Sequence, residues 1–587
     1  MEKWFITMKK ADFQEISDKF HITPVTARLI RNRDVVGDEA IQEYLRGDLN
    51  DLHDPFLMKG MREAVSIIQQ KIAEQKAIRI IGDYDIDGVC STYILLTAFQ
   101  KLGACVDTDI PDRLKDGYGI NEQLIQRAYE SGIDTIVTCD NGIAAIDQIA
   151  YAKSLGMTVV VTDHHDIPYI EHDDGSREIL TSQADVIINP KQQDCAYPFE
   201  NLCGAAVAYK LSQALYESAG FRREDAYPLL EFAAFATVGD VMDLVGENRI
   251  LVKIGLRMLQ NTQNRGMRAL IQVNDLTGKK LTAYHIGFVL GPCINASGRL
   301  DTAKRALKLL QARDAEEAET LAGDLKALND SRKYMTLQGV EKAMELIDST
   351  DLKMDKVLVV YLPECHESLA GIIAGRIREK YHRPVFVLTD SEEGVKGSGR
   401  SIEAYSMFEE MTRCRDLFTK FGGHPMAAGC SLLPENLERL RKQLNQQTTL
   451  TEEDFVEKVS IDVAMPLHYI TEQQIRELEL LEPFGKGNQK PLFAEKDLKV
   501  RGARILGKNK NVLKMQLENT AGQTIDAMLF QEVPAFLQYI SEKFGEAQMQ
   551  RMLNGMDSEV NISVTYFPTV NEYNGKRTLQ IIIENYR

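Results

Sequence analysis

The chain of 587 residues is long enough for about three to five domains, at roughly 100 to 200 residues for each domain. Its composition, with 44% hydrophobic and 26% charged residues, is that of an ordinary globular protein and excludes collagen-like, disordered and coiled-coil chains. The formal net charge of −17 argues against a general nucleic-acid coat, because cations drive phosphate binding, but it leaves room for a local basic channel.

Nothing in the sequence indicates a membrane span or export. No apolar run approaches the roughly 18 residues that a span needs, and the first residues, MEKWFITMKK, lack the features of a signal peptide. The nine cysteines form no CxxC pair, which argues against a disulfide framework and a thiolate zinc site. We therefore expect a cytoplasmic protein without membrane contact.

The first half of the chain predicts a helical lead-in followed by an α/β domain. Residues 1–75 are expected to be mostly helical, with Thr23-Pro24 as a helix start. From residue 77 to about 189, short apolar β-branched runs alternate with helical stretches, which predicts a parallel sheet with crossover helices. The strands are expected at 78–81, 135–138, 159–162 and 186–188, and helices at 203–260.

The second half predicts a long helix, a second α/β domain and a β-domain. Residues 303–348 are rich in Ala, Glu, Lys and Leu and contain no Pro, which predicts one or two long helices. A second α/β pattern opens with a strand at 356–361 and runs to about 444. From about 458, alternating strands predict a small β-barrel or β-sandwich, with Val560, Ile562, Val564 and Tyr566 facing one way.

Each of the first three predicted strands ends at a cluster of potential metal ligands. Because the C-terminal ends of parallel strands share one rim, six carboxylates and two imidazoles are expected to converge there. Such crowding raises carboxylate pKa values unless cations neutralise the charges. Oxygen ligands with a minority of imidazole predict two divalent cations, Mn²⁺ or Mg²⁺, that would clamp a phosphoryl group. The clusters are Asp83-Tyr84-Asp85-Ile86-Asp87-Gly88, Asp140-Asn141-Gly142 and Asp163-His164-His165-Asp166.

Two other interpretations of these aspartates stay open. An Asp after a strand commonly caps a helix or forms a turn. The alternating Asp pattern also resembles a calcium loop, but an EF-hand needs Glu at its twelfth position, where this chain has Ile94. Three clusters on successive strands favour the metal centre.

These clusters resemble the first motifs of the DHH phosphoesterase superfamily, and further stretches resemble its RecJ family of bacterial single-strand-specific exonucleases. The resemblance implies an α/β fold with a DHH parallel-sheet domain, a long connecting helix, a smaller DHH-associated α/β domain and a C-terminal OB-like β-barrel. The stretches are PDRLKDGYG (111–119), TVGDVMDLVGENR (237–249), GPCINASGRL (291–300), GSGRS (397–401), FGGHPMAAG (421–429) and LEPFGKGN (481–488).

The resemblance also implies domain limits. The expected order is a helical N-terminal lead-in, the catalytic DHH domain, the connecting helix, the DHH-associated domain with its Gly-Gly-His motif, and an OB-fold nucleic-acid-binding domain. The limits are 1–50, 51–300, 301–350, 351–450 and 455–587.

Individual roles follow from the same resemblance. The metal ligands would be Asp83, Asp85, Asp87, Asp140, His164 and Asp240, with Asp140 bridging two ions. The catalytic residues would be Asp83, Asp87, His165 and His424, and both histidines would reach the scissile phosphate. Substrate would be held by Arg113, Tyr118, Arg299, Ser398, Arg400 and His424, with Arg299, Ser398 and Arg400 around a terminal 5′-phosphate.

The chain departs from the family pattern at two places. Cys365-His366-Glu367-Ser368 stands where the family often has Trp-His-x-Gly, so no role carries over to His366. Asp243 stands where Pro is common and gives a second carboxylate three residues after Asp240. We assign the ligand to Asp240 because Gly239-Asp240 directly follows the apolar helical stretch.

The implied function is a metal-dependent 5′-to-3′ exonuclease that hydrolyses single-stranded DNA to 5′-mononucleotides in recombination and repair. A single-strand-binding protein and a RecQ-type helicase would be its partners. Two alternatives stay open: a DHH phosphatase or phosphodiesterase on short oligonucleotides or cyclic dinucleotides, and an inactive DNA-binding replication scaffold. The terminal β-domain argues against the first, and the complete ligand set argues against the second.

The C-terminal β-domain carries a local excess of cations that has two interpretations. It is either a path for single-stranded DNA or a solvated charged face. The residues are Lys486, Lys490, Arg501, Arg504, Lys508, Lys510 and Lys514.

Overall fold

The computed structural model describes residues 2–113, 116–117, 119–172, 175–392, 394–530, 532–573 and 575–587. These residues fold into two compact units. Unit 1 consists of residues 52–242 and 250–457, and unit 2 consists of residues 2–51, 243–249 and 458–587.

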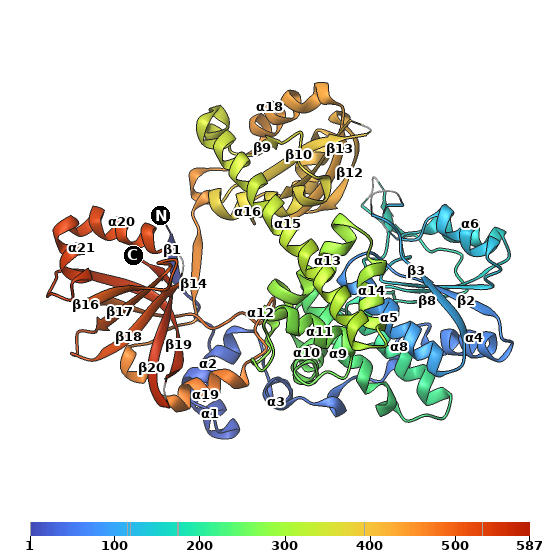
Figure 1. Ribbon diagram of the computed structural model, residues 1–587, viewed down its shortest axis with the longest axis horizontal. Helices are drawn as coiled ribbons and strands as arrows, with labels where there is room; N and C mark the ends of the chain where they lie inside the picture. The colour runs from blue at the N-terminus through green and yellow to red at the C-terminus, as the bar shows by residue number, and fades with distance from the viewer. Residues whose placement is uncertain are drawn as a thin grey trace. The chain divides into compact units, whose positions relative to one another are not determined.

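Unit 1 begins with a parallel sheet in the order β3-β2-β4-β5-β8 (Figure 1). The four strands predicted from apolar runs are present, and β3 is an additional edge strand. Its sequence, CVDTD, lacks an apolar run because every second residue faces outward at the edge of the sheet. The strands are β2 (Ala77–Ile81), β3 (Cys105–Asp109), β4 (Thr135–Cys139), β5 (Thr158–Thr162) and β8 (Val186–Ile188).

Helices cover both faces of this sheet. On one face, α6 (Glu122–Glu130) and α7 (Ile146–Ser154) bury their apolar side chains against the strands. On the other face, α5 (Ile86–Lys101) packs between the strands and two further helices, α8 (Gly204–Ser218) and α9 (Tyr227–Gly239), as Figure 1 shows. Because α5 is enclosed in this way, most of its residues are buried and it shows no amphipathic stripe.

The other helices of this part surround that core. Residues 203–260 are helical as predicted, in α8, α9 and α10. A small hairpin of β6 (Tyr169–Glu171) and β7 (Arg177–Ile179) is exposed. The remaining elements are α4 (Met61–Ala73), α10 (Gly246–Leu259), α11 (Arg265–Val273), α12 (Ala283–His285), a π-helical turn at Ile286–Leu290 and α13 (Gly291–Leu300).

The predicted long helix is present, after a short one. α14 (Lys304–Gln311) is followed by α15 (Ala315–Ser349), which spans 35 residues. The carboxylate of Asp314 caps α15, because it accepts a hydrogen bond of 2.8 Å from the Glu317 amide. This cap separates the two helices.

A second, mixed sheet follows α15 in the order β12-β13-β11-β10-β9. β9 and β10 are parallel, whereas the other neighbours are antiparallel. α16 (Ala370–Tyr381) packs on one face of β9 and β10, and α18 (Leu437–Gln447) packs on the opposite face. The elements are β9 (Leu358–Tyr361), β10 (Val385–Ser391), β11 (Gly394–Arg400), α17 (Met407–Arg413), β12 (Phe418–His424) and β13 (Ala427–Leu432).

Unit 2 contains the predicted C-terminal barrel. Its strands run in the order β16-β17-β18-β20-β19, and a further pairing of β19 with β16 closes the barrel. Val560, Ile562, Val564 and Tyr566 are buried together, as their alternation predicts. The elements are β15 (Val463–Ala464), α19 (Glu472–Leu480), β16 (Phe493–Leu506), β17 (Val512–Glu518), β18 (Thr524–Phe530), α20 (Val533–Phe544), α21 (Glu546–Leu553), β19 (Asn561–Tyr573) and β20 (Lys576–Tyr586).

The N-terminal segment belongs to unit 2, whereas the sequence treated it as a separate lead-in. It opens with a strand, β1 (Lys3–Ile6), which pairs in parallel with β14 (Lys458–Ile461). Three helices follow: α1 (Phe13–Phe20), α2 (Pro24–Asn32) and α3 (Asp38–Arg46). Their apolar side chains join the core of the barrel, so the segment completes that core.

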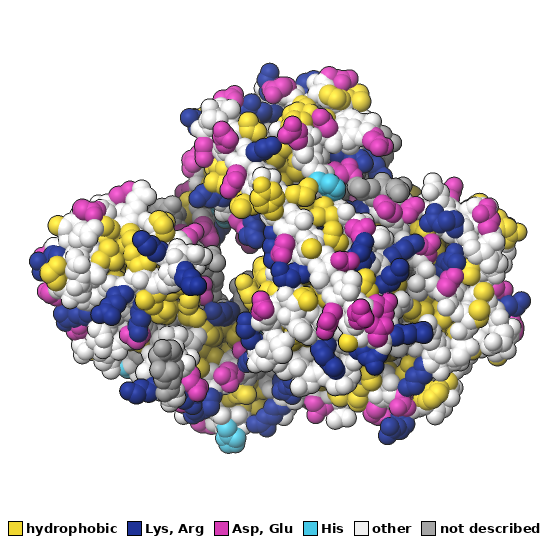
Figure 2. All heavy atoms as spheres, viewed as in Figure 1, with side chains coloured by type: hydrophobic (Ala, Val, Ile, Leu, Met, Phe, Trp, Pro, Cys, Tyr) yellow, Lys and Arg dark blue, Asp and Glu magenta, His cyan; other side chains and the backbone are white. Residues whose placement is uncertain are grey.

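The acidic surplus is spread out on the surface that Figure 2 shows. Lys and Arg side chains lie among Asp and Glu side chains over both units in that view, rather than on one acidic face. None of the helices in the described residues is long and apolar enough to cross a membrane.

Candidate metal centre and substrate pocket

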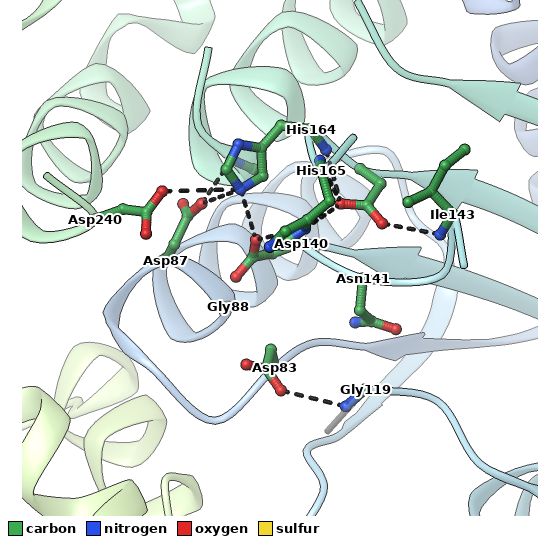
Figure 3. A network of polar contacts seen from close by, with 12 residues as sticks. Asp83, Asp87, Gly88, Gly119, Asp140, Asn141, Ile143, His164, His165 and Asp240 are labelled. Atoms are coloured by element: carbon green, nitrogen blue, oxygen red, sulfur yellow. Dashed lines mark hydrogen bonds and ion pairs between the residues drawn. The ribbon is translucent and has the colours of Figure 1, made fainter. Parts of the chain in front are cut away.

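The predicted metal ligands meet at the C-terminal rim of the parallel sheet (Figure 3). They come from the ends of β2, β4 and β5, from the first turn of α5 and from the end of α9. Three sets of ligand atoms each lie within 4.8 Å of one another: Asp83, Asp85 and Asp140; Asp87, His164 and Asp240; and Asp140, His164 and His165. The first two sets contain all six predicted ligands, and Asp140 joins the first set to the third.

His164 is the centre of the second set. Its Nε2 atom lies 3.1 Å from Oδ1 of Asp140, 3.5 Å from Oδ2 of Asp87 and 3.8 Å from Oδ2 of Asp240. Burial lowers the pKa of His164 below its ordinary value. The imidazole is therefore held in its neutral form, which is the form that ligates metals.

Asp87 is held by the beginning of α8. Its two carboxylate oxygens accept hydrogen bonds from the amides of Gly204, at 2.6 Å, and Ala205, at 2.7 Å. The Asp87 side chain is fully buried, and the positive end of the helix dipole stabilises its charge there. The helix thus fixes a ligand that no neighbouring residue in sequence could orient.

Asp85 has the capping role that was considered from sequence and also lies among the predicted ligands. Its Oδ1 atom accepts hydrogen bonds from the amides of Asp87, at 2.9 Å, and Gly88, at 3.1 Å, so Asp85 is the N-cap of α5. The capping interpretation is confirmed for this residue. The cap also holds the carboxylate beside Asp83 and Asp140.

The carboxylates of the first set destabilise one another's charge. Burial, followed by the charge of Asp85, raises the pKa of Asp83 to about 8. Burial and neighbouring carboxylates also raise the pKa values of Asp85 and Asp140 above the ordinary value. A buried set of oxygen donors that ionises reluctantly is matched to hard divalent cations, which favour the ionised form. The residues therefore fit Mn²⁺ or Mg²⁺.

Asp163 positions His165, a role that sequence reasoning did not assign. Nδ1 of His165 lies 2.7 Å from Oδ1 of Asp163, and Oδ2 of Asp163 accepts a hydrogen bond of 2.9 Å from the Ile143 amide (Figure 3). Burial opposes protonation of His165, but the hydrogen bond and charge of Asp163 outweigh it and raise the pKa of His165 to about 9. The half-exposed imidazole is therefore a cation at the edge of the metal centre.

The expected convergence of six carboxylates is wrong for Asp166. Its side chain is 93% exposed and forms an ion pair of 2.7 Å with Lys191. The chain turns outward after His165, so Asp166 leaves the rim while Asp163 stays buried beneath it.

The carboxylate after α9 that lies among the predicted ligands is that of Asp240 rather than that of Asp243. Asp240 follows the last residue of α9 and faces His164, whereas Oδ1 of Asp243 lies 3.5 Å from Nζ of Lys486. The two carboxylates thus have different partners, although three residues separate them.

Arg299, Ser398 and Arg400 each lie next to the segment that opens α16. Nη1 of Arg299 donates a hydrogen bond of 2.8 Å to the Ser368 carbonyl. A Cβ atom on Gly371 would lie 2.8 Å from Nη2 of Arg400 and 3.4 Å from Cβ of Ser398. Because glycine has no side chain, Arg400 and Ser398 can lie this close to the helix backbone. Burial, together with other arginines, lowers the pKa of Arg299 to about 10. Arginines beside a helix N-terminus are suited to binding phosphate, so the position of these residues is compatible with the predicted role.

Arg113 and Ser398, among the predicted substrate residues, line a cavity of about 410 Å³ in unit 1. Arg113 lines it and lies over the Tyr84 ring, 5.0 Å from the ring centroid. His424 is exposed at the end of β12, where its Nδ1 accepts a long hydrogen bond of 3.4 Å from the Met426 amide. The predicted role of Tyr118 falls outside the described residues.

Comparison with known proteins gives the family of the chain. Three family models match: the DHH family N-terminal domain at residues 77–238, the DHHA1 domain at 354–449 and the RecJ OB domain at 461–585. A curated relative from Bacillus subtilis, the single-stranded-DNA-specific exonuclease RecJ, is 36% identical over 99% of this chain and 70% of its own length.

This chain belongs to the RecJ family. Solved structures agree with the assignment. RecJ from Thermus thermophilus in complex with Mn²⁺ matches with a TM-score of 0.81 and 28% identity, over 100% of this chain and 79% of that one. The complex of the same enzyme with Mg²⁺ matches with a TM-score of 0.75 and 26% identity, over 100% and 78% of the two chains. The expected metals are those of these relatives.

The chain departs from the RecJ family pattern at Cys365 and Ser368, on either side of His366. His366 is the N-cap of the short helix before α16, and its Nδ1 atom lies 2.8 Å from Oγ of Ser368. The same residue, Ser368, offers its carbonyl to Arg299. His366 thus contacts the same residue that Arg299 contacts.

The predicted cationic residues of the RecJ OB domain are largely paired. Lys490 and Lys514 form ion pairs with Glu584 and Asp526, at 3.1 and 2.8 Å. Arg501 contacts Glu518 and Asp557, and Lys486 contacts Asp243. Four of the seven cations therefore form part of a solvated charged face.

Proposed function

We propose that this protein is a metal-dependent exonuclease that degrades single-stranded DNA from its 5′ end and releases 5′-mononucleotides. One observation carries the proposal: unit 1 contains both the sets of possible ligand atoms around Asp83 and His164 and, beside the segment that opens α16, Arg299, Ser398 and Arg400. An enzyme that cuts at a strand end needs both a cleavage centre and a group that recognises the end.

The metal ligands would be divided between two ions. Asp83, Asp85 and Asp140 would hold one, and Asp87, His164 and Asp240 would hold the other, with Asp140 placed to bridge them through its 3.1 Å approach to His164. When bound, the two cations would neutralise the scissile phosphate and activate water for in-line attack.

The side chains of the protein would bind and orient the strand. Arg299 and Arg400 offer planar guanidinium groups, which match phosphate oxygens through paired hydrogen bonds. His165, kept protonated by Asp163, would bring a positive charge to the scissile phosphate. Arg113, stacked on Tyr84, would contact the backbone between the two positions. His424 would reach the scissile phosphate from β12.

The context of the reaction is part of the proposal. An enzyme restricted to single strands needs another protein to open duplex DNA, so we place it with a RecQ-type helicase and a single-strand-binding protein in the cytoplasm, in recombination and repair. The test is resection of a blunt duplex by purified components. Degradation that requires the helicase supports this placement, whereas degradation of the duplex by the exonuclease alone contradicts it.

A time course on a 40-nucleotide single strand with a 5′-phosphate tests the activity. The strand is labelled at either end and incubated with Mn²⁺ or with chelator, beside a blunt duplex of the same sequence. Early release of labelled mononucleotide from the 5′ end, dependent on metal and absent on duplex, is expected. Hydrolysis of only two- to five-nucleotide oligomers or cyclic dinucleotides would instead identify a small-substrate phosphodiesterase. Binding without cleavage would identify a scaffold.

A further inference from the structure

β11 presents three polar side chains on one face of the sheet in the DHHA1 domain. Lys396, Ser398 and Arg400 are spaced by two residues, so they point to the same side of the strand. Ser398 and Arg400 belong to the proposed pocket for the terminal phosphate. Lys396 extends this line by one step, which is about 7 Å at a rise of about 3.4 Å per residue.

The neighbouring strands complete a row at Lys396. Lys396 lies opposite Ser431 of β13, and Ser431 lies opposite Lys420 of β12. Opposed residues of antiparallel strands share a face, so two lysines flank one serine hydroxyl. The row has a donor at each of its three positions and no acceptor-only side chain.

This row lines the cavity of about 410 Å³ described above. Gly422 and Gly429, which lie opposite each other in the register, also line it and place no side chain in it. On the opposite side, Tyr84 and Arg113 of the DHH domain contribute to the wall. The row therefore faces an open cavity whose other wall comes from the DHH domain.

The described lining of this cavity carries more positive than negative charge. Lys396, Lys420 and Arg113 are cations, and Glu367 is the carboxylate among them. Nζ of Lys396 lies 3.3 Å from Oε2 of Glu367, so one of the three cations is compensated. The remaining charge favours an anionic ligand.

We propose that Lys396, Ser431 and Lys420 form a second phosphate subsite, which binds a phosphate group beyond the terminal phosphate held by Ser398 and Arg400. The inference rests on the proposed exonuclease function, because it takes Ser398 and Arg400 as the place of the 5′-phosphate. Lysine binds phosphate as a point charge on a flexible stem, and a hydroxyl adds a hydrogen bond.

Two kinds of strand would bring a phosphate to this subsite. In the first kind, a 5′-triphosphate, the first phosphate would lie at Ser398 and Arg400. Its outer phosphates would then extend toward Lys396. Alternatively, a strand that advances by one more nucleotide would place its 5′-phosphate among the lysines, and a dinucleotide would be released. The chemistry of recognition is the same in both cases, and the products distinguish them.

The experiment compares 40-nucleotide single strands with a 5′-hydroxyl, a 5′-monophosphate or a 5′-triphosphate, in the presence of Mn²⁺. The proteins are the wild type, the double variant Lys396→Met with Lys420→Met, Arg400→Gln, and Lys442→Met as a control on the exposed face of α18. Rates at low substrate concentration give kcat/KM, and mass spectrometry identifies the first product.

We expect the wild type to cut the triphosphorylated strand and to release a nucleoside triphosphate. The double variant should lose at least tenfold in kcat/KM on that strand and stay within twofold of wild type on the monophosphate, whereas Arg400→Gln should lose activity on the monophosphate. Dinucleotides released from the monophosphate strand by the wild type, and lost in the double variant, would also support the subsite and assign it to an additional nucleotide.

Two results would overturn the inference. The first is a double variant that matches the wild type on every strand and in every product. The second is a wild type that cuts the monophosphate strand but neither accepts the triphosphate nor releases dinucleotides. A wild type that cuts none of the strands would remove the exonuclease function itself, which separates that failure from the failure of the subsite.

Discussion

Gly204 lies against Asp140 so closely that a Cβ atom on the glycine would lie 2.6 Å from Cβ and 2.9 Å from Cα of Asp140. Gly204 is also the first residue of α8, and its amide donates a hydrogen bond of 2.6 Å to Asp87. One glycine therefore sets the positions of two predicted ligands that are far apart in sequence.

The variant Gly204→Ala should impair the metal centre more than the fold. Either Asp140 or the start of α8 must move, and we expect a loss of at least tenfold in cleavage rate and weaker Mn²⁺ binding. Gly323→Ala on α15, where no atom lies within 4 Å of the added Cβ position, is the matched control. Calorimetric titration with Mn²⁺ and a single-strand cleavage assay measure both effects. Unchanged Mn²⁺ affinity in Gly204→Ala would contradict this account.

The two neighbouring carboxylates after α9 should behave differently. Asp240→Ala removes a side chain 3.8 Å from His164, and we expect cleavage to fall by at least 1,000-fold, a barrier increase of about 4 kcal/mol. Asp243→Ala removes a partner of Lys486 and should keep activity within about threefold. Parallel kinetics with equal amounts of folded protein provide the comparison. The assignment fails if Asp243→Ala is the inactive variant.

Mn²⁺ affinity should rise with pH through the range in which the crowded carboxylates ionise. The pKa of Asp83 is raised to about 8, and those of Asp85 and Asp140 are also raised. At a pH below these pKa values, Mn²⁺ must displace the bound protons. The Mn²⁺ affinity should therefore fall by about tenfold for each unit by which the pH is lowered, for each proton displaced. Titrations at pH 6.5, 7.5 and 8.5 in buffers of different ionisation enthalpy count these protons. Constant affinity without proton release would show that the carboxylates are already ionised.

Glu231 should make the stability of the fold depend on pH. It is buried in α9, accepts a hydrogen bond of 2.8 Å from Thr262, and burial raises its pKa to about 7 from an ordinary 4.5. The folded state thus binds a proton more tightly than the unfolded state, so this residue destabilises the fold increasingly as pH rises from about 4.5 to about 7.

The variant Glu231→Gln removes this titration and keeps an acceptor for Thr262. Relative to wild type, its free energy of unfolding should rise by about 2 kcal/mol between pH 5.5 and 8. Urea unfolding of both proteins with chelator measures the difference, and Glu319→Gln on the exposed face of α15 is the control. A difference that does not change with pH would show that Glu231 stays ionised in the fold.

The sequence predicted the elements whose local pattern is strong. The apolar runs of β2, β4, β5 and β8 and the proline-free α15 lie where expected, because burial on two faces or a long helix leaves a clear signal. β3 was missed, since an edge strand with alternating acidic residues has no apolar run. β1 was also missed, because it is a strand through its pairing with β14. In that pairing Lys3 lies opposite Lys458, which is 455 residues later in the chain.

The site was predictable to the extent that strand ends determine it. Asp83, Asp85 and Asp140 converge because parallel strands share a rim. The roles of Asp163 and Asp166 were not predictable, because they depend on whether the chain turns inward or outward after β5. The sequence left the division of ligands between two ions open, and the proposed division rests on distances that only the fold provides.

The number of Mn²⁺ ions required for turnover tests the central claim most directly. Chelator-treated protein is titrated with Mn²⁺, and the ions bound per chain are measured beside the rate of mononucleotide release from a 5′-phosphorylated single strand. With the ligand sets around Asp83 and His164, two ions should bind and cleavage should follow the second equivalent. Full cleavage with one bound ion, or with none in the presence of chelator, would contradict the two-metal account.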